Sequence, residues 1–193
     1  SWMFSRASFL WMSEIMLDLA EKYHDRLQIA FKPHPRLKSE LYKHPSWGKV
    51  KTDDYYQRWA DSDNTQLETG DFVDLFKSSD AMIHDCASFT AEYLYTRKPT
   101  MFIVKDNHTA EHFNSFGQKC FNLHYHAHQP ADVEEFIQNV VILGNDTMKS
   151  KREDFYKEFL YPKDGIMPSQ KIVDTIVSLL VENNDCNKNN DNL

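Results

Sequence analysis

Short apolar runs alternate with helix-patterned segments along most of the chain, and this alternation constrains the fold more than any other feature. The runs at residues 27–31, 81–85 and 99–105 have the length and apolar content of buried strands. Apolar residues at helical spacing precede the first run, over residues 7–23, and separate the later two, over residues 88–97. Parallel strands need such crossovers between them. The sequence therefore predicts an α/β fold: a Rossmann-like, doubly wound, mostly parallel sheet with helices on both faces.

The remaining segments extend this pattern. A short strand is expected at residues 65–69, and a helix capped by Asp71 follows it. The last third of the chain has helical periodicity and is expected to wrap the sheet, over residues 131–143, 148–160 and 168–182. A chain of 193 residues has room for one such domain. We therefore expect one domain over residues 1–182 and a disordered polar tail over residues 183–193.

Charge and composition exclude several classes of protein. The net charge is −7 and hydrophobic residues make up 41% of the chain, which is not typical of a nucleic-acid binder or a polybasic membrane binder. No apolar run approaches the roughly 20 residues of a membrane-spanning helix. Charged residues interrupt the apolar pattern at the start, so we exclude a signal peptide and expect a cytoplasmic protein. Because the chain opens in or just before a helix, with Ser1 in place of an initiator methionine, we interpret it as a piece of a larger protein.

Two sequence patterns resemble metal sites, but neither predicts one. The D-S-D triplet at residues 61–63 lies in a polar stretch and is typical of a solvated helix end. The H-Y-H-A-H run at residues 124–128 has no carboxylate or cysteine at a familiar ligand spacing, and we expect residues 124–130 to form a crossover loop. The three cysteines show neither paired zinc spacing nor a disulfide framework. No metal or other cofactor is expected.

The segment D-A-M-I-H-D-C-A-S-F-T-A-E, residues 80–92, is the first candidate site. A buried strand ends at Asp85, and Ser88 begins a helix whose free backbone N–H groups suit a phosphate. Ser88 and Thr90 add hydroxyl donors, and Glu92 is placed to accept hydrogen bonds from ribose hydroxyls. The alternative is that Ser88 is an N-cap and Glu92 its capping-box partner.

The segment F-K-P-H-P-R-L, residues 31–37, is the second candidate site. Pro33 and Pro35 have no N–H and favour extended geometry in the preceding residues, so His34 is held on a stiff turn at a strand end. In open α/β sheets that edge is the ligand crevice. His34 is able to donate to a phosphate or to protonate a leaving group, and Lys32 and Arg36 add positive charge. The alternative is a histidine that only caps the loop.

These two segments and a third resemble one family. "FKPHPRL", "GDFVDLFKSSDAMIHDCASFTAEYLYTRKPTMFIV" and "YPKDGIMPSQKIVDTIV" are together similar to the C-terminal half of the CDP-glycerol glycerophosphotransferases, the teichoic-acid polymerases and their capsule-synthesis relatives. The resemblance covers about residues 8–180. It implies a two-domain GT-B fold in which this half binds the nucleotide donor and an N-terminal domain, absent here, holds the acceptor. Residues 1–182 would then be the donor-binding domain.

The resemblance also implies roles for individual residues. His34 matches the family's H-P histidine, which contacts the donor pyrophosphate. Asp85 and Ser88 match the D-Y-S-S segment, which reads D-C-A-S here, and Glu92 occupies the acidic position after it. The expected site comprises a catalytic His34 and donor-binding Lys32, Arg36, Asp85, Ser88, Phe89, Thr90 and Glu92. The family's Arg-Gly segment is replaced by "HFNSFGQKCFN", which leaves a nucleotide sugar open as the donor.

The resulting hypothesis is a transferase domain. It would move glycerol phosphate, a polyol phosphate or a sugar from a CDP- or UDP-linked donor to a cell-surface polymer. The alternatives are a nucleotide-sugar 2-epimerase and a non-catalytic nucleotide-binding module. The expected partners are the donor, CDP-glycerol or a nucleotide sugar, and the absent N-terminal domain, with no nucleic acid. Peripheral association of the full-length protein with the inner face of the membrane is left open.

Overall fold

The fold is taken from a computed structural model, which describes residues 8–106 and 108–190, the last ten of these as backbone only. It contains two compact units, Ser1–Arg152 and Glu153–Leu193, and each is described here by itself. Helix α10 (Pro168–Asn190) runs through much of the expected tail, and residues 191–193 lie outside the described residues. The predicted division at residue 182 stays a prediction.

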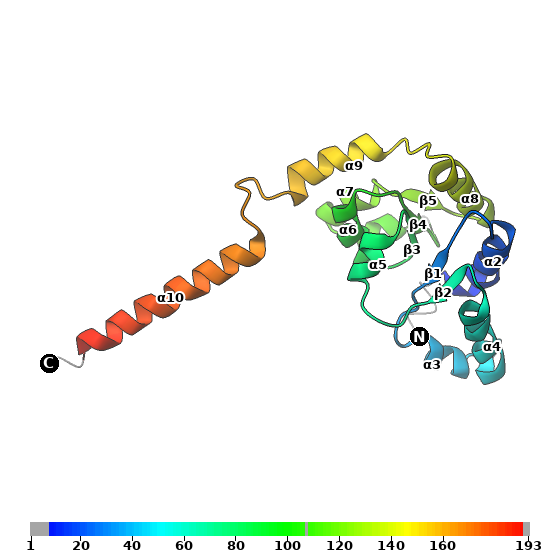
Figure 1. Ribbon diagram of the computed structural model, residues 1–193, viewed down its shortest axis with the longest axis horizontal. Coiled ribbons are helices and arrows are strands. Elements are labelled where there is room, and N and C mark those ends of the chain that lie inside the picture. The colour runs from blue at the N-terminus through cyan, green and yellow to red at the C-terminus, as the bar shows by residue number, and fades with distance from the viewer. Residues whose placement is uncertain (1–7, 107, 191–193) are drawn as a thin grey trace. The chain divides into compact units, whose positions relative to one another are not determined.

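All strand pairs of the first unit are parallel, as the alternating pattern predicts (Figure 1). They form a two-stranded sheet, β1-β2, and a three-stranded sheet in the order β3-β4-β5. The strands are short: β1 (Ile29–Phe31), β2 (Thr65–Leu67), β3 (Met82–His84), β4 (Thr100–Ile103) and β5 (Tyr125–Ala127). Together with the covering helices they make a Rossmann-like α/β fold.

Strand β5 corrects one expectation. Residues 124–130 were expected to form a loop, but Tyr125–Ala127 pair with β4, with Phe102 opposite His126. No strand was predicted here because the run carries histidines in place of the aliphatic residues that are typical of a buried strand. Ala127 is nevertheless fully buried in the strand, His126 is half-buried, and His124, directly before the strand, is buried.

Helices lie before, between and after the strands. The first unit contains α2 (Phe9–Lys22), α3 (Leu37–Lys43), α4 (Gly48–Asp61), α5 (Val73–Ser78), α6 (Phe89–Glu92), α7 (Ser115–Phe121) and α8 (Pro130–Glu135). Short 3₁₀ segments cover Tyr93–Thr96 and Thr109–His112, and a π-helical segment, Phe136–Ile142, continues α8. Helix α9 (Lys149–Phe155) is continued by the π-helical segment Tyr156–Leu160. The three helices predicted in the last third are therefore present.

The three-stranded sheet is covered on both faces. Every residue of β4 is buried. Met101 and Ile103 belong to an apolar cluster with residues of α2 and α8, whereas Phe102 packs against Phe121 of α7. Because neighbouring residues of a strand point to opposite faces, this burial requires a layer on each side. The predicted two-sided cover is confirmed for this sheet.

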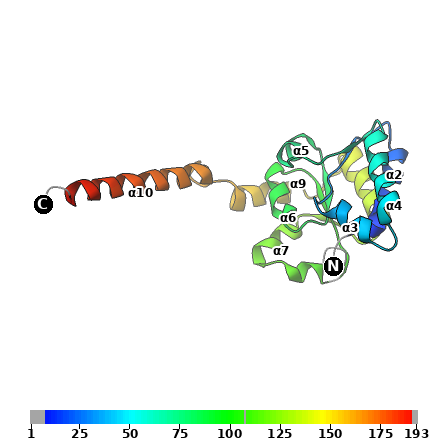
Figure 2. The ribbon, with the colours of Figure 1, turned by 90° about the horizontal axis from the view of Figure 1, so that it is seen from below.

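Helix α2 packs against both sheets. Met12 and Leu19 of α2 join the cluster that contains β4 and β5. Leu17 of the same helix joins a second cluster built on α3 and α4, which lie side by side (Figure 2). That cluster is rich in aromatic residues, including Trp47, Tyr55, Tyr56 and Trp59, and packs against β1 and β2. One helix thus connects the two sheets of the unit.

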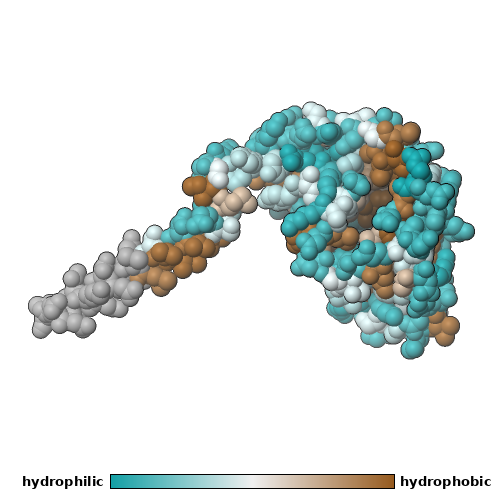
Figure 3. Space-filling view, viewed as in Figure 1, coloured by the Kyte–Doolittle hydropathy of each residue, from teal (hydrophilic) through white to brown (hydrophobic). Residues whose placement is uncertain are grey.

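Helix α10 of the second unit carries apolar side chains along one strip, which Figure 3 shows in brown. The side chains of this strip are exposed: Ile172, Val173, Ile176, Val177, Leu179 and Leu180. The expectation that this helix wraps the sheet stays a prediction. In the described part of the chain, no helix combines the length and apolar character that a membrane span requires.

Candidate functional site

The N-terminus of α2 connects the carboxyl ends of β1 and β3. The backbone N–H and the hydroxyl of Ser8 both donate to Oδ2 of Asp85, at 2.8 and 3.0 Å. The ring of the next residue, Phe9, lies 6.2 Å from the ring of Phe31 at the end of β1. Because Ser8 and Phe9 are neighbours, the ends of both strands lie around the same point. The segments that contain His34 and Ser88 therefore both begin at this edge.

The Lys32–Arg36 turn is held by local hydrogen bonds to the ring and the carbonyl of His34. The N–H of Arg36 donates to Nδ1 of His34 at 3.2 Å, and the N–H of Leu37 donates to the His34 carbonyl at 2.8 Å. His34 itself is exposed. A neutral imidazole whose Nδ1 accepts a hydrogen bond carries its proton on Nε2. The turn therefore leaves His34 with an Nε2–H that is able to donate to a ligand.

The two cations of this turn have partners within the chain. The ammonium of Lys32 donates to the carbonyl of Gly70, beyond the end of β2. The exposed guanidinium of Arg36 lies 3.5 Å from the carboxylate of Glu40, a half-buried residue of α3. Because Arg36 itself is exposed and this contact is long, Arg36 is able to exchange its partner for an anionic ligand.

The Asp85–Ser88 turn is shaped mainly by side chains from within and around it. Thr90 is buried, and its hydroxyl donates to the carbonyl of Cys86 at 3.3 Å. Nδ1 of His84 lies 3.2 Å from the backbone nitrogen of Cys86. Asp85 holds Ser8, as described above. Asp85 and Thr90, both predicted to contact a donor, therefore support the turn in this structure, and their contact with a ligand stays a prediction.

Ser88 is exposed and does not cap the helix that follows it. Its backbone already has helical angles, φ −67° and ψ −39°, and its side chain makes no capping hydrogen bond. Its hydroxyl instead lies 3.3 Å from Sγ of Cys86. The capping alternative is therefore not realised here. The helix itself is shorter than expected, since a single α-turn, Phe89–Glu92, passes directly into the 3₁₀ segment.

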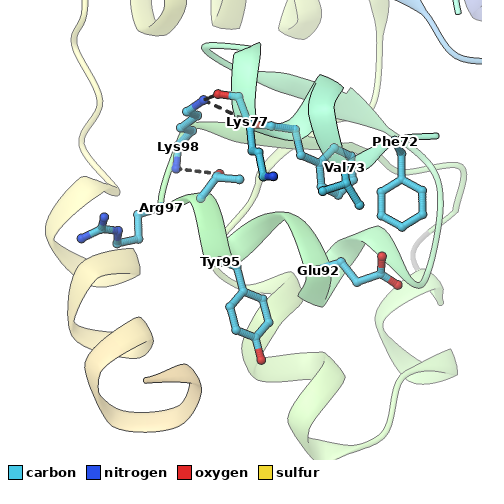
Figure 4. Close-up of a pocket in the computed structure, with 9 residues that line it drawn as sticks. Phe72, Val73, Lys77, Glu92, Tyr95, Arg97 and Lys98 are labelled. Carbon is cyan, nitrogen blue, oxygen red and sulfur yellow. Dashed lines mark hydrogen bonds between the residues drawn. The ribbon is translucent and has the colours of Figure 1, made fainter. Parts of the chain in front are cut away.

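Glu92 lines a cleft of about 490 Å³ between α5 and the helical segments after Ser88 (Figure 4). Its walls are formed by Phe72, Val73, Phe76, Lys77, Glu92, Tyr95, Thr96, Arg97 and Lys98. In Figure 4 the carboxylate of Glu92 lies on the Phe72 side of the cleft. The ammonium of Lys98 donates to the backbone carbonyls of Phe76 and Lys77, which fixes the end of α5. The predicted ribose contact of Glu92 stays a prediction.

Phe89 packs inside an aromatic cluster. Its ring centroid lies 5.1 Å from that of Phe72 and 5.0 Å from that of Phe76. These contacts hold α5 against α6. Phe89 therefore packs against other aromatic side chains, and its predicted contact with the donor stays a prediction.

The histidine-rich run contributes to the core rather than to a cluster of ligands. Nδ1 of His124 lies 2.9 Å from the carbonyl of Cys120, and Nε2 of His126 lies 3.0 Å from the carbonyl of Phe121. The ring of His126 stacks on Phe121 at 4.1 Å. Over residues 8–106 and 108–180, where side chains are described, no group of three or more His, Cys, Asp or Glu residues is arranged to hold a metal ion.

Sequence reasoning did not single out two residues that shape the site. Ser8 anchors α2 to the turn, and His84 contacts the turn backbone. Ser8 carried no local signal, because its partner is far away in the sequence. His84 carried one signal: a histidine directly before a strand-terminal aspartate, at a position where β3 is otherwise apolar.

Comparison with protein families gave a match over most of the chain. The model described as "CDP-Glycerol:Poly(glycerophosphate) glycerophosphotransferase" matches residues 8–178, which include both candidate segments and all the strands. Comparisons with curated proteins and with solved structures gave no match.

Proposed function

We propose that this chain is the donor-binding part of a transferase, because it belongs to the CDP-glycerol:poly(glycerophosphate) glycerophosphotransferase family. The donor would be CDP-glycerol or another CDP- or UDP-linked compound. The group transferred would be glycerol phosphate, a polyol phosphate or a sugar, and the acceptor a cell-surface polymer. The acceptor would be held by an N-terminal domain of a GT-B pair.

One observation supports the location of the donor site. Helix α2 brings the carboxyl ends of β1 and β3 to the same edge through the Ser8–Asp85 bonds and the Phe9–Phe31 contact. In open α/β sheets, this edge is where ligands bind. His34 and Ser88 follow these strand ends, and both are exposed.

The proposed chemistry assigns different work to different residues. The acceptor hydroxyl attacks the transferred group, and the nucleotide leaves with the negative charge of its phosphate. The Nε2–H of His34 and the hydroxyl of Ser88 donate to phosphate oxygens, while Lys32 and Arg36 offset the charge. Glu92 accepts from the ribose. Asp85 and Thr90 hold the turn that carries Ser88. The proposal assigns no metal, and the general base belongs to the acceptor domain.

Calorimetric titration with CDP, UDP, ADP and GDP tests the proposal. We expect one pyrimidine diphosphate to bind in the micromolar to low-millimolar range. The variants His34→Ala and Ser88→Ala should each weaken binding about tenfold, the effect of one lost charge-assisted hydrogen bond. His24→Ala is the matched control, because this exposed histidine lies beyond the C-terminal end of α2 and bonds to Asp63, before the amino end of β2.

The outcome separates the candidate functions. Equal affinity in the wild type, His34→Ala and Ser88→Ala would refute the assignment of the site. Titration with CDP-glycerol and with UDP-sugars then identifies the donor class. Failure of all nucleotides to bind would favour a non-catalytic module, and the same titrations on the full-length protein would decide this.

A further inference from the structure

His84 is a buried histidine at the end of β3, directly before the Asp85–Ser88 turn, with 8% of its surface exposed. Its Nδ1 lies 3.2 Å from the backbone nitrogen of Cys86 and 3.1 Å from the backbone oxygen of the same residue. A ring nitrogen without a proton accepts a hydrogen bond, and one with a proton donates. Only one of the two contacts can therefore be a hydrogen bond at a given time.

The surroundings of His84 contain little to stabilise a charge. Its ring meets Phe102 of β4 at 5.1 Å and Phe89 of α6 at 6.5 Å. The titratable side chain of His124, directly before β5, also faces it, with the ring centroids 5.2 Å apart. On its own segment, the Cys86 thiol lies beside Ser88, and the Asp85 carboxylate accepts from Ser8.

Burial, with a smaller contribution from His124, holds the pKa of His84 well below its ordinary value. Nε2 of His84 is buried and has no hydrogen-bond partner among the described residues. The ring is therefore neutral at physiological pH. Its tautomer is decided by the choice between the two backbone atoms of Cys86.

The carbonyl of Cys86 already has a donor. Thr90 is buried and donates its hydroxyl to this oxygen at 3.3 Å. The N–H of Cys86 has His84 as its acceptor. If Nδ1 carried the proton, the carbonyl would receive two donors and the N–H would lose its acceptor. The arrangement that satisfies both backbone groups has Nδ1 unprotonated and the proton on Nε2.

We propose that His84 is a positioning residue for the donor site, which holds the Asp85–Ser88 turn through an unprotonated Nδ1 that accepts from the Cys86 N–H. The donor-binding consequence rests on the proposed function. Protonation of Nδ1 removes the acceptor, frees the Cys86 N–H and turns the imidazole into a second donor to the Cys86 carbonyl. The turn then changes shape, and Ser88 moves with it.

Two measurements test the proposal, and the first needs no ligand. Long-range proton–nitrogen NMR spectra of the wild type at pH 7.5 report which ring nitrogen of His84 carries the proton. Assignment uses the loss of its signals in His84→Asn. We expect the Nε2–H tautomer. The Nδ1–H tautomer would overturn the proposal, whatever the donor does.

The second measurement compares two amide variants in titrations with CDP-glycerol. The side-chain oxygen of His84→Asn lies near the position of Nδ1 and is able to accept from Cys86, whereas the amide of His84→Gln reaches the position of Nε2. Both variants lose the ring, so packing loss is similar. We expect His84→Asn to bind within about threefold of the wild type and His84→Gln to bind about tenfold more weakly, the effect of one lost hydrogen bond.

The pH dependence adds a readout that simple packing loss would not produce. CDP-glycerol has no phosphate group that titrates near neutral pH. Wild-type affinity should be level at neutral pH and fall only well below pH 6.5, because burial lowers the pKa of His84, whereas His84→Asn should lack the His84-dependent part of this fall. Equal affinity of His84→Gln and the wild type overturns the inference. Absence of CDP-glycerol binding by the wild type refutes the proposed donor and the donor-binding consequence, while the tautomer still decides whether His84 positions the turn.

Discussion

Acid should destabilise the first unit through His124. This side chain is 1% exposed, and Nδ1 lies 2.9 Å from the Cys120 carbonyl, so the neutral ring donates from Nδ1. Nε2 is buried and has no hydrogen-bond partner among the described residues. A proton on Nε2 would create a buried cation without a counterion. Burial therefore lowers the pKa of His124 to about 4.

The sign and size of the effect follow from linkage. The unfolded chain, with a histidine pKa of about 6.5, binds the proton more readily than the folded protein, so the free energy of unfolding falls as the pH falls below about 6.5. With the folded pKa at about 4, the loss is about 2 kcal/mol at pH 5 and about 3 kcal/mol at pH 4. The pKa of His84 is lowered in the same direction and adds to this loss.

Urea unfolding followed by tryptophan fluorescence measures this effect, because Trp47 and Trp59 are buried in the first unit. The variant His124→Asn keeps an N–H near Nδ1 but does not titrate. Between pH 7 and pH 5 the wild type should lose about 2 kcal/mol more than this variant. His128→Asn, at an exposed position, should match the wild type. Equal pH slopes for the wild type and His124→Asn would refute the reasoning.

Three further predictions concern stability. Asp85→Ala removes the acceptor of both Ser8 bonds and should lower the free energy of unfolding by about 1–2 kcal/mol, with the amide of Ser8 exchanging faster with solvent. Lys98→Met removes the hydrogen bonds to carbonyls at the end of α5 and should cost about 1–2 kcal/mol, seen as faster amide exchange in α5 but unchanged exchange in α2. Trp59→Ala opens a cavity in the α3–α4 cluster and should cost about 3–5 kcal/mol in urea unfolding, against less than 1 kcal/mol for Val50→Ala, whose side chain is exposed.

Several features of this protein were determined by local sequence. The alternation of apolar runs and helical periodicity was sufficient to predict a parallel α/β fold, because each strand must bury its apolar residues and parallel strands need crossovers. Pro33 and Pro35 fix the turn around His34 through their own ring geometry. These features depend on neighbours in the chain and need no distant partner.

The tertiary structure decided which polar side chains bond to other parts of the chain. Aspartate and threonine often contact ligands, so the sequence alone suggested this role for Asp85 and Thr90. In the structure, however, Asp85 accepts hydrogen bonds from Ser8, which lies 77 positions away along the chain. The histidines of 124–128 read as a loop, but pairing with β4 makes part of them a strand. The role of His84 emerged only once its ring was placed against the Cys86 backbone. A hydrogen bond depends on distance in space, and the packing of remote segments sets that distance, so the spacing of residues in the sequence alone could not assign these partners.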